Sequence, residues 1–165
     1  MNDGSTKSSV SGGTVSPNET TASYAPTILI VDDNTEMTEI TKLLIEKHTN
    51  IKVLTAFSGK EALETLQEEA VDTIILDMNM PDMTGSECFR IIRKRSIYVP
   101  VIFLTGKVSD ECKNDQLALG AFDYIEKPIK AKDLIILLKD AIAAMERIRS
   151  LLIRPNSSSS QNQAS

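Results

Sequence analysis

Aromatic residues are scarce in this sequence: they make up 4% of its 165 residues, and tryptophan is absent. A buried core must therefore be built mainly from aliphatic side chains. Only two cysteines occur, Cys88 and Cys112, with neither the spacing of metal ligands nor that of a disulfide framework. Their positions suit packing or surface residues, and reduced thiols are typical of a cytosolic protein.

Positive charge is also in short supply. The formal net charge is -5, and no basic stripe runs along the chain, which argues against non-specific nucleic-acid binding. The one histidine, His48, lies in the polar run EKHTN, which predicts a solvated helix end and not a phosphate relay.

Long hydrophobic runs are missing as well. No apolar stretch approaches the roughly 18 residues of a membrane-spanning helix, and the start of the chain lacks the apolar centre of a signal peptide. Apolar residues make up 41% and charged residues 25% of the chain, as in ordinary globular proteins. The sequence predicts a soluble, cytoplasmic protein.

The two ends of the chain have a composition of their own. Residues 1–26 and 155–165 are rich in Ser, Thr, Gly, Asn and Pro, and have little apolar surface to bury. Such segments are typical of disordered tails. We expect one folded domain over residues 27–154.

Within that domain, strand-like and helix-like patterns alternate. Asn34, Ser58, Thr84 and Ser109 are suitable residues to open helices, and Gly120 is suitable to end one. The five predicted strands are 27–31, 51–57, 74–76, 101–104 and 122–126. Short loops between five strands and five helices predict parallel βαβ units in a doubly wound α/β sheet.

Reactive residues follow four of these strands. Asp32 and Asp33 end the first, Asp77 the third, Thr105 the fourth and Lys127 the fifth. The carboxyl ends of parallel strands meet at one sheet edge, where three carboxylates would repel one another without a cation. Their hard oxygens suit Mg²⁺, and a hydroxyl with an ammonium suits a phosphoryl group. This pattern predicts phosphoryl transfer onto Asp77, although each residue alone would also suit a helix cap or a solvated turn.

Four motifs in order, ILIVDD, IILDMNMPDMTG, VIFLTG and YIEKP, carry a resemblance to a known family. Over about residues 27–145 the chain resembles the receiver domains of two-component response regulators, in size similar to the single-domain chemotaxis and sporulation regulators. The resemblance implies the flavodoxin-like strand order 2-1-3-4-5. The pattern of residues alone does not give that order.

The resemblance also implies roles for the acidic residues. Asp77 would accept phosphate from a histidine kinase or a histidine phosphotransfer protein. Asp33 and Asp77 would ligate Mg²⁺ directly, together with the backbone carbonyl of Asn79, and Asp32 would act largely through water. Asn79 and Lys107 would border the route of the hydrolytic water and tune the lifetime of the phosphate.

A switch is implied in the same way. Lys127 would pair with the phosphoryl oxygens, and Thr105 would donate its hydroxyl to one of them. Tyr124 matches the aromatic residue that turns inward when Thr105 moves, although it also suits an ordinary half-buried strand residue. Lys127–Pro128 would be a cis peptide. Activation would then change binding of a target protein at the face formed by the fourth helix, fifth strand and last helix.

The last helix is longer than a receiver domain needs. Its apolar residues follow the 4-3-4 spacing of a coiled-coil seam: Leu134, Leu138, Ala141, Met145, Ile148 and Leu152. The first half of this seam must pack on the sheet. The second half suits either a homodimer or partner contact, or simple wrapping on the domain.

Three functions compete at this point. The first is a phosphorylation-controlled switch without an attached output domain, which acts on a partner or passes its phosphate onward, and is no turnover enzyme. The second is an aspartyl-phosphate phosphatase of the haloacid-dehalogenase type, which wants a second acid where Asn79 stands. The third is a docking module independent of phosphate, which the intact acid pair, Thr105 and Lys127 argue against.

Overall fold

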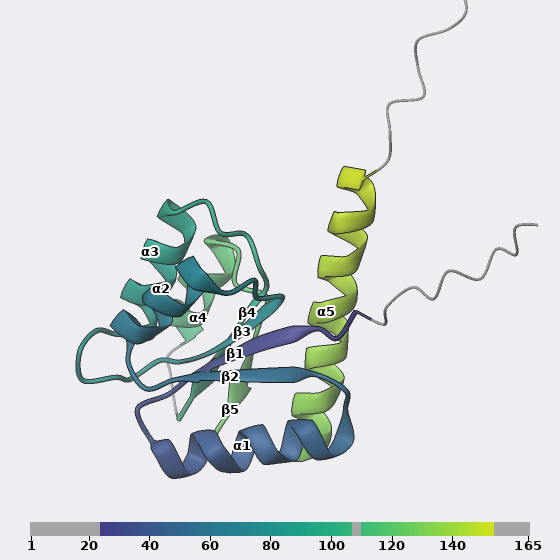
Figure 1. Ribbon diagram of the computed structural model, residues 1–165. Helices are drawn as coiled ribbons and strands as arrows, with labels where there is room; N and C mark the ends of the chain where they lie inside the picture. The colour runs from purple at the N-terminus through teal and green to yellow at the C-terminus, as the bar shows by residue number, and fades with distance from the viewer. Residues whose placement is uncertain (1–23, 107–109, 154–165) are drawn as a thin grey trace, which may run out of the picture.

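The computed structural model of the chain describes residues 24–106 and 110–153 (Figure 1), so most of the two predicted tails lies outside it. Its centre is one parallel sheet in the order β2-β1-β3-β4-β5, with β5 at an open edge. The strands are β1 (Thr27–Val31), β2 (Lys52–Ala56), β3 (Thr73–Asp77), β4 (Val101–Thr105) and β5 (Asp123–Glu126). The predicted fold class and strand order are confirmed.

Five helices cover both faces of this sheet. They are α1 (Thr35–His48), α2 (Gly59–Glu68), α3 (Gly85–Lys94), α4 (Asp110–Ala118) and α5 (Ala131–Ile153). Helices α1 and α5 lie on one face, and α2, α3 and α4 lie on the other (Figure 1). None of the helices in the described ranges is long and apolar enough to cross a membrane.

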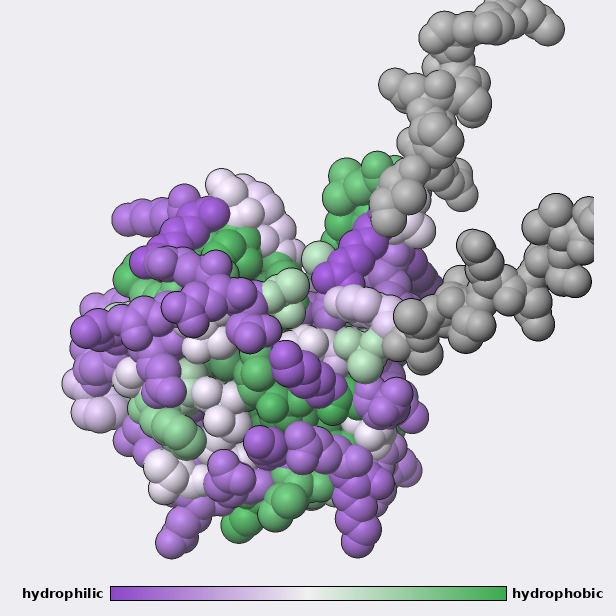
Figure 2. Space-filling model, viewed as in Figure 1, coloured by the Kyte–Doolittle hydropathy of each residue, from purple (hydrophilic) through white to green (hydrophobic). Residues whose placement is uncertain are grey.

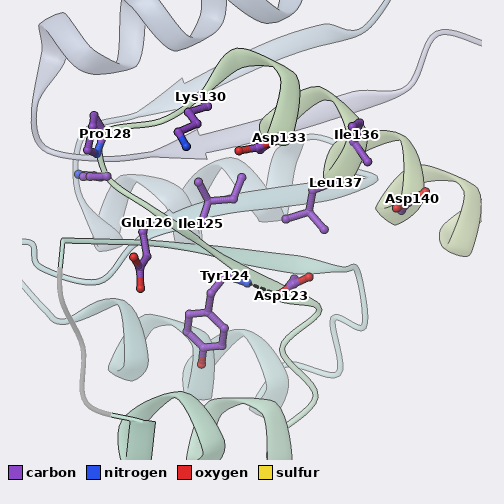
Figure 3. Close-up of a pocket in the computed structure, with 11 residues that line it drawn as sticks. Asp123, Tyr124, Ile125, Glu126, Pro128, Lys130, Asp133, Ile136, Leu137 and Asp140 are labelled. Atoms are coloured by element: carbon purple, nitrogen blue, oxygen red, sulfur yellow. Dashed lines mark hydrogen bonds between the residues drawn. The ribbon is translucent and has the colours of Figure 1, made fainter.

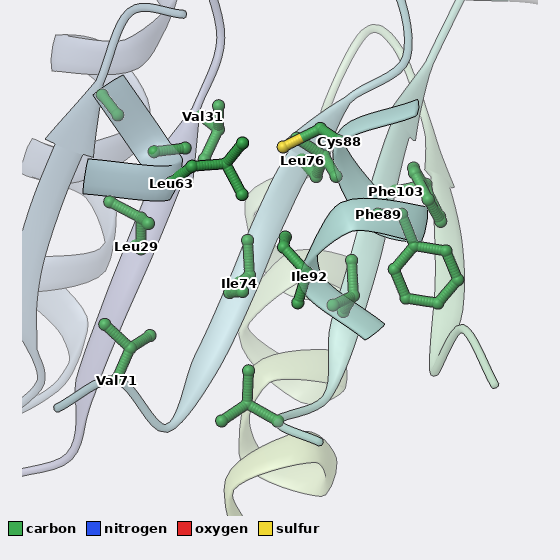
Figure 4. Close-up of a cluster of buried hydrophobic side chains, with 14 of the residues drawn as sticks. Leu29, Val31, Leu63, Val71, Ile74, Leu76, Cys88, Phe89, Ile92 and Phe103 are labelled. Atoms are coloured by element: carbon green, nitrogen blue, oxygen red, sulfur yellow. The ribbon is translucent and has the colours of Figure 1, made fainter. Parts of the chain in front are cut away.

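Two hydrophobic clusters hold the layers together. On the α2–α3 side, Leu76 and Phe103 of the sheet pack with Phe89 and Ile92 of α3 (Figure 4). The rings of Phe89 and Phe103 meet edge to face, with centroids 5.3 Å apart. Cys88 is buried in the same cluster, and burial raises the pKa of its thiol to about 11, so it acts as a packing residue. The second cluster joins the opposite sheet face to α1 and α5.

The predicted helix starts are formed by side-chain caps. Asn34 accepts a hydrogen bond from the Met37 N–H at the start of α1, and Thr84 forms a complete capping box with Glu87 at the start of α3. Ser58 caps α2, but Glu61 accepts the N–H of Phe57 instead of closing a box. The predicted start at Ser109 lies outside the described residues.

The inner face of α1 does not follow the spacing of its apolar residues. Met37, Ile40, Leu43 and Leu44 recur at helical spacing, yet Ile40 and Leu43 are 60% and 64% exposed. The buried residues of α1 are Thr38, Thr41 and Ile45. The Thr38 hydroxyl donates to the carbonyl of Asn34, so a polar side chain is buried without leaving its donor unpaired.

Helix α5 extends past the amino edge of the sheet. Leu134, Leu138 and Ala141 of its seam are buried, whereas Leu152 is 79% exposed and gives the projecting end a hydrophobic surface (Figure 2). Just before that end, the guanidinium of Arg149 forms an ion pair with the buried Asp72. Asp72 therefore fixes the long helix to the start of β3.

The same aspartate holds the segment that enters β1. Asp72 accepts the hydroxyl of Tyr24 at 2.6 Å and the N–H of Thr27 at 2.7 Å. Burial and the hydrogen bond to Asp72 raise the pKa of Tyr24. Tyr24, three residues before the predicted domain start at 27, thus contacts the folded domain through Asp72. The domain bounds stay a prediction.

Candidate functional site

The carboxyl edge of the sheet brings together the strand-end residues that the sequence singled out. Asp32 follows β1, and Asp77 ends β3, which is the neighbour of β1. Thr105 ends β4, next in the sheet, and Lys127 follows β5. Asp32, Asp77 and Thr105 are buried, and Asp33 is exposed.

Lys127 links the two buried acids. Its ammonium lies 2.8 Å from Oδ2 of Asp32 and 2.8 Å from Oδ1 of Asp77. The side chains of the two aspartates are 2% and 6% exposed, against 25% for Lys127. One cation thus compensates two carboxylates that are almost closed to water.

This arrangement shifts the titration of the central acid. Burial, followed by the charge of Asp32, raises the pKa of Asp77, and the hydrogen bonds from Lys127 and the Asn79 N–H oppose that rise. Burial alone would lower the pKa of Lys127, but its hydrogen bonds to Asp32 and Asp77 raise it. The raised pKa of Lys127 keeps its ammonium protonated, and the raised pKa of Asp77 makes this carboxylate more basic than an exposed one.

The donor set fits a hard divalent cation. Asp32, Asp33 and Asp77 each offer a carboxylate oxygen, and these oxygens all lie within 4.8 Å of one another. Three carboxylates at such spacing, one of them exposed, suit Mg²⁺, which keeps several of its waters. Asn79 is exposed beside them, and its N–H donates to Oδ2 of Asp77 at 3.2 Å.

Thr105 contributes a polar atom without a partner. Its side chain is fully buried, and its Oγ1 has no hydrogen-bond partner among the described residues. A buried hydroxyl normally makes a hydrogen bond, because an unmade one costs about 1–3 kcal/mol. The Thr105 hydroxyl is therefore able to donate a hydrogen bond to a group at this edge of the sheet, or to accept one from it.

Tyr124 lies on β5, two residues before the end of that strand. It is half-buried, and its ring stacks on that of Phe103 with centroids 5.4 Å apart. The Lys127–Pro128 peptide is cis, as predicted. Lys107 falls outside the described residues.

A family model described as "Response regulator receiver domain" matches residues 28–139, about two thirds of the chain. The chain belongs to this receiver family. Its structural neighbours agree in both sequence and fold. The receiver domain of the Francisella response regulator 1452 is 34% identical with a TM-score of 0.68, covering 72% of this chain and 98% of its own. Chemotaxis protein CheY4 of Vibrio cholerae is 32% identical with a TM-score of 0.67, covering 72% and 99%.

A curated relative is longer than the matched region. Response regulator SaeR of Staphylococcus aureus is 31% identical over 120 residues, which is 73% of this chain and 52% of that protein. The chain therefore spans about half the length of the curated relatives that it matches. As a receiver domain it is a two-component signalling module and not a classical enzyme.

Two features of this receiver domain position the loop after Asp77, and sequence reasoning assigned a role to neither. Gly85 opens α3 directly against β3: a Cβ there would collide with the carbonyl oxygen of Asp77 and lie 3.0 Å from Cα of Met78. Glycine is therefore required for close packing.

The second feature is Asp82, in the same loop. Its two carboxylate oxygens accept the N–H groups of Gly59 and Lys60 at 3.2 and 3.0 Å, which caps α2. Burial acts to raise the pKa of Asp82, but the backbone donors, Lys60 and Gly59 first, lower it. The loop that carries Asn79 is thus tied to α2, a contact between distant segments that no local pattern reveals.

Proposed function

We propose that this receiver domain is a phosphorylation-controlled switch in which Asp77 accepts a phosphoryl group from a histidine kinase or a histidine phosphotransfer protein. An oxygen of Asp77 attacks phosphorus, the bond from phosphorus to the donor nitrogen breaks, and an acyl phosphate forms. The observation that carries this proposal is the buried carboxylate pair held by Lys127 beside the orphaned hydroxyl of Thr105.

Mg²⁺ is the proposed cofactor. Asp33, Asp77 and the backbone carbonyl of Asn79 would hold it, with Asp32 acting through water. The cation would neutralise charge on the transferring phosphoryl group. The carboxylate oxygens within 4.8 Å of one another support this assignment.

The phosphoryl oxygens would find their partners in the protein. The Lys127 ammonium would exchange part of its contact with Asp32 for a contact with the phosphoryl oxygens. The Thr105 hydroxyl would donate a hydrogen bond to one of these oxygens. Asn79 and Lys107 would tune the rate of autodephosphorylation, because both would border the route of the attacking water.

Tyr124 is the proposed link from this site to a partner. Movement of Thr105 at the end of β4 would alter the packing of Tyr124 on Phe103, which joins β4 to the neighbouring edge strand. The result would be altered binding at the face of α4, β5 and α5. Tyr124→Ala should leave phosphorylation intact and remove its effect on partner affinity, whereas an unchanged effect would assign the ring to packing alone.

Two further roles belong to this proposal. The chain would equally serve as a relay intermediate if Asp77 gave its phosphate to another protein.

The apolar end of α5, with Leu151 and Leu152 exposed, would support a weak homodimer. A monomer in light scattering well above micromolar concentration would contradict the homodimer. A cytoplasmic location fits such partners, and cell fractionation would test it.

Phosphorylation by a small donor separates the proposed function from its alternatives. With acetyl phosphate and Mg²⁺, we expect intact-mass spectrometry to show one slowly decaying phosphoryl group that Asp77→Asn abolishes. A phosphatase would instead release inorganic phosphate over many turnovers, and a docking module independent of phosphate would do neither.

A further inference from the structure

A groove runs between the edge strand β5 and helix α5 on the outside of the sheet (Figure 3). Its apolar part is formed by Ile125, Ile136 and Leu137, and Ile136 is 50% exposed. Figure 3 shows Asp133, Ile136, Leu137 and Asp140 following one another along α5 beside this strand. Exposed apolar residues gathered in a groove can mark a place where a partner binds, and here they lie mainly on α5.

The charge around this strip is strongly one-sided. Asp123, Glu126, Asp133 and Asp140 line the groove, against Lys127 and Lys130. The Lys127 ammonium forms ion pairs with Asp32 and Asp77, which already compensate its charge. Among the described residues, Lys130 is then the one lining cation not held by the buried acids, against Asp133 and Asp140 on the same helix and Asp123 on β5.

We propose that this groove binds a cationic amphipathic helix of another protein. Asp133 and Asp140 are seven residues apart on α5, which places them about 10 Å apart along the helix, two turns. Lys or Arg residues at the same two-turn spacing on a partner helix would meet both, while its apolar residues cover Ile136 and Leu137. The groove thereby indicates the chemical class of the partner of the proposed switch, namely a basic amphipathic helix.

The same charges disfavour other occupants. Nucleic acid and anionic membrane surfaces have the wrong sign. Like charges placed face to face disfavour both. The exception is a second copy of the chain, whose α3 carries Arg90, Arg93 and Lys94 beside Phe89. A dimer in light scattering that is lost in Asp133→Asn with Asp140→Asn would identify that occupant and overturn the assignment to another protein.

This inference rests on the proposed function only for its link to phosphorylation, because the groove is formed in the unphosphorylated chain. The probe is a synthetic peptide with the repeat LKKLLKL, titrated into the full chain by calorimetry, with the matched repeat LEELLEL as its control. We expect the Lys peptide to bind, to weaken as salt is raised and to shift NMR signals of β5 and α5. The Glu peptide should not bind.

Two double variants place the peptide. Asp133→Asn with Asp140→Asn should weaken binding about tenfold or more, because both neutralised acids are at the groove. Glu39→Gln with Glu46→Gln removes two exposed acids at the same spacing on α1 and should change affinity about twofold or less. All four acids are exposed, so both variants should fold, as circular dichroism would show.

Three results would overturn the groove assignment: equal losses in the two variants, a larger loss in the α1 variant, or no binding of the Lys peptide by wild type. Phosphorylation by acetyl phosphate is measured on the same samples. Failure of that reaction in wild type would defeat the proposed function, whereas the peptide titration decides the groove alone.

Discussion

Replacing Lys127 by Met removes the one ammonium shared by Asp32 and Asp77 and keeps an unbranched side chain of similar length. Breaking a buried ion pair by removing one partner costs about 3–5 kcal/mol. The Lys127 side chain is 25% exposed, so solvent screens part of that loss. We expect Lys127→Met to lower the free energy of unfolding by about 2–3 kcal/mol near neutral pH, and Lys130→Met, its exposed neighbour, by about 0.5 kcal/mol at most.

This cost should depend on pH in a defined direction. The pKa of Asp77 is raised by burial and by Asp32, so its contribution to stability is present below the ordinary Asp pKa and is lost as pH rises through the raised pKa. In Lys127→Met, burial and the charge of Asp32 raise the pKa of Asp77 with less opposition. The difference between variant and wild type should therefore be larger at about pH 8 than at about pH 5.

Urea unfolding followed by circular dichroism measures these values, since the chain has no tryptophan. Mg²⁺ should reduce the difference in unfolding free energy between wild type and Lys127→Met, because the cation can compensate the two acids that have lost their ammonium. A ligand at about 100 times its Kd stabilises a protein by about 2.7 kcal/mol. Equal stabilities for Lys127→Met and Lys130→Met, or a gap that shrinks with rising pH, would refute this electrostatic account.

Two further predictions follow from contacts outside the acidic cluster. Gly85→Ala should destabilise the domain by about 1–3 kcal/mol in urea unfolding and slow phosphorylation, because its Cβ collides with the backbone of Asp77; wild-type behaviour in both assays would show that the loop has room. Arg149→Met should speed hydrogen exchange in the last turns of α5 about tenfold by removing the ion pair with Asp72. Unchanged exchange there would show that the helix end is held without it.

Much of the fold was predictable because its signals are local. Caps such as Asn34 and Thr84, and the acids at the ends of β1 and β3, are read within a few residues. The meeting of Asp32, Asp77, Thr105 and Lys127 then follows from parallel topology, which places all the strand ends at one edge.

Other contacts were not predictable because their partners are distant in sequence or depart from apolar periodicity. The inner face of α1 uses Thr38 and Thr41, which no hydrophobic pattern identifies. Asp82 reaches the start of α2, and Arg149 reaches Asp72, across long separations. Such pairs become visible only when the helices have been placed on the sheet.

The central claim is that Asp77 itself carries the phosphate, and the most direct measurement identifies the modified residue. Borohydride reduces an aspartyl acyl phosphate to homoserine, which peptide mass spectrometry then locates. After treatment with acetyl phosphate and Mg²⁺, we expect homoserine at position 77 and none in Asp77→Asn. Homoserine at another aspartate, or none in wild type under conditions that phosphorylate a known receiver domain, would contradict the account.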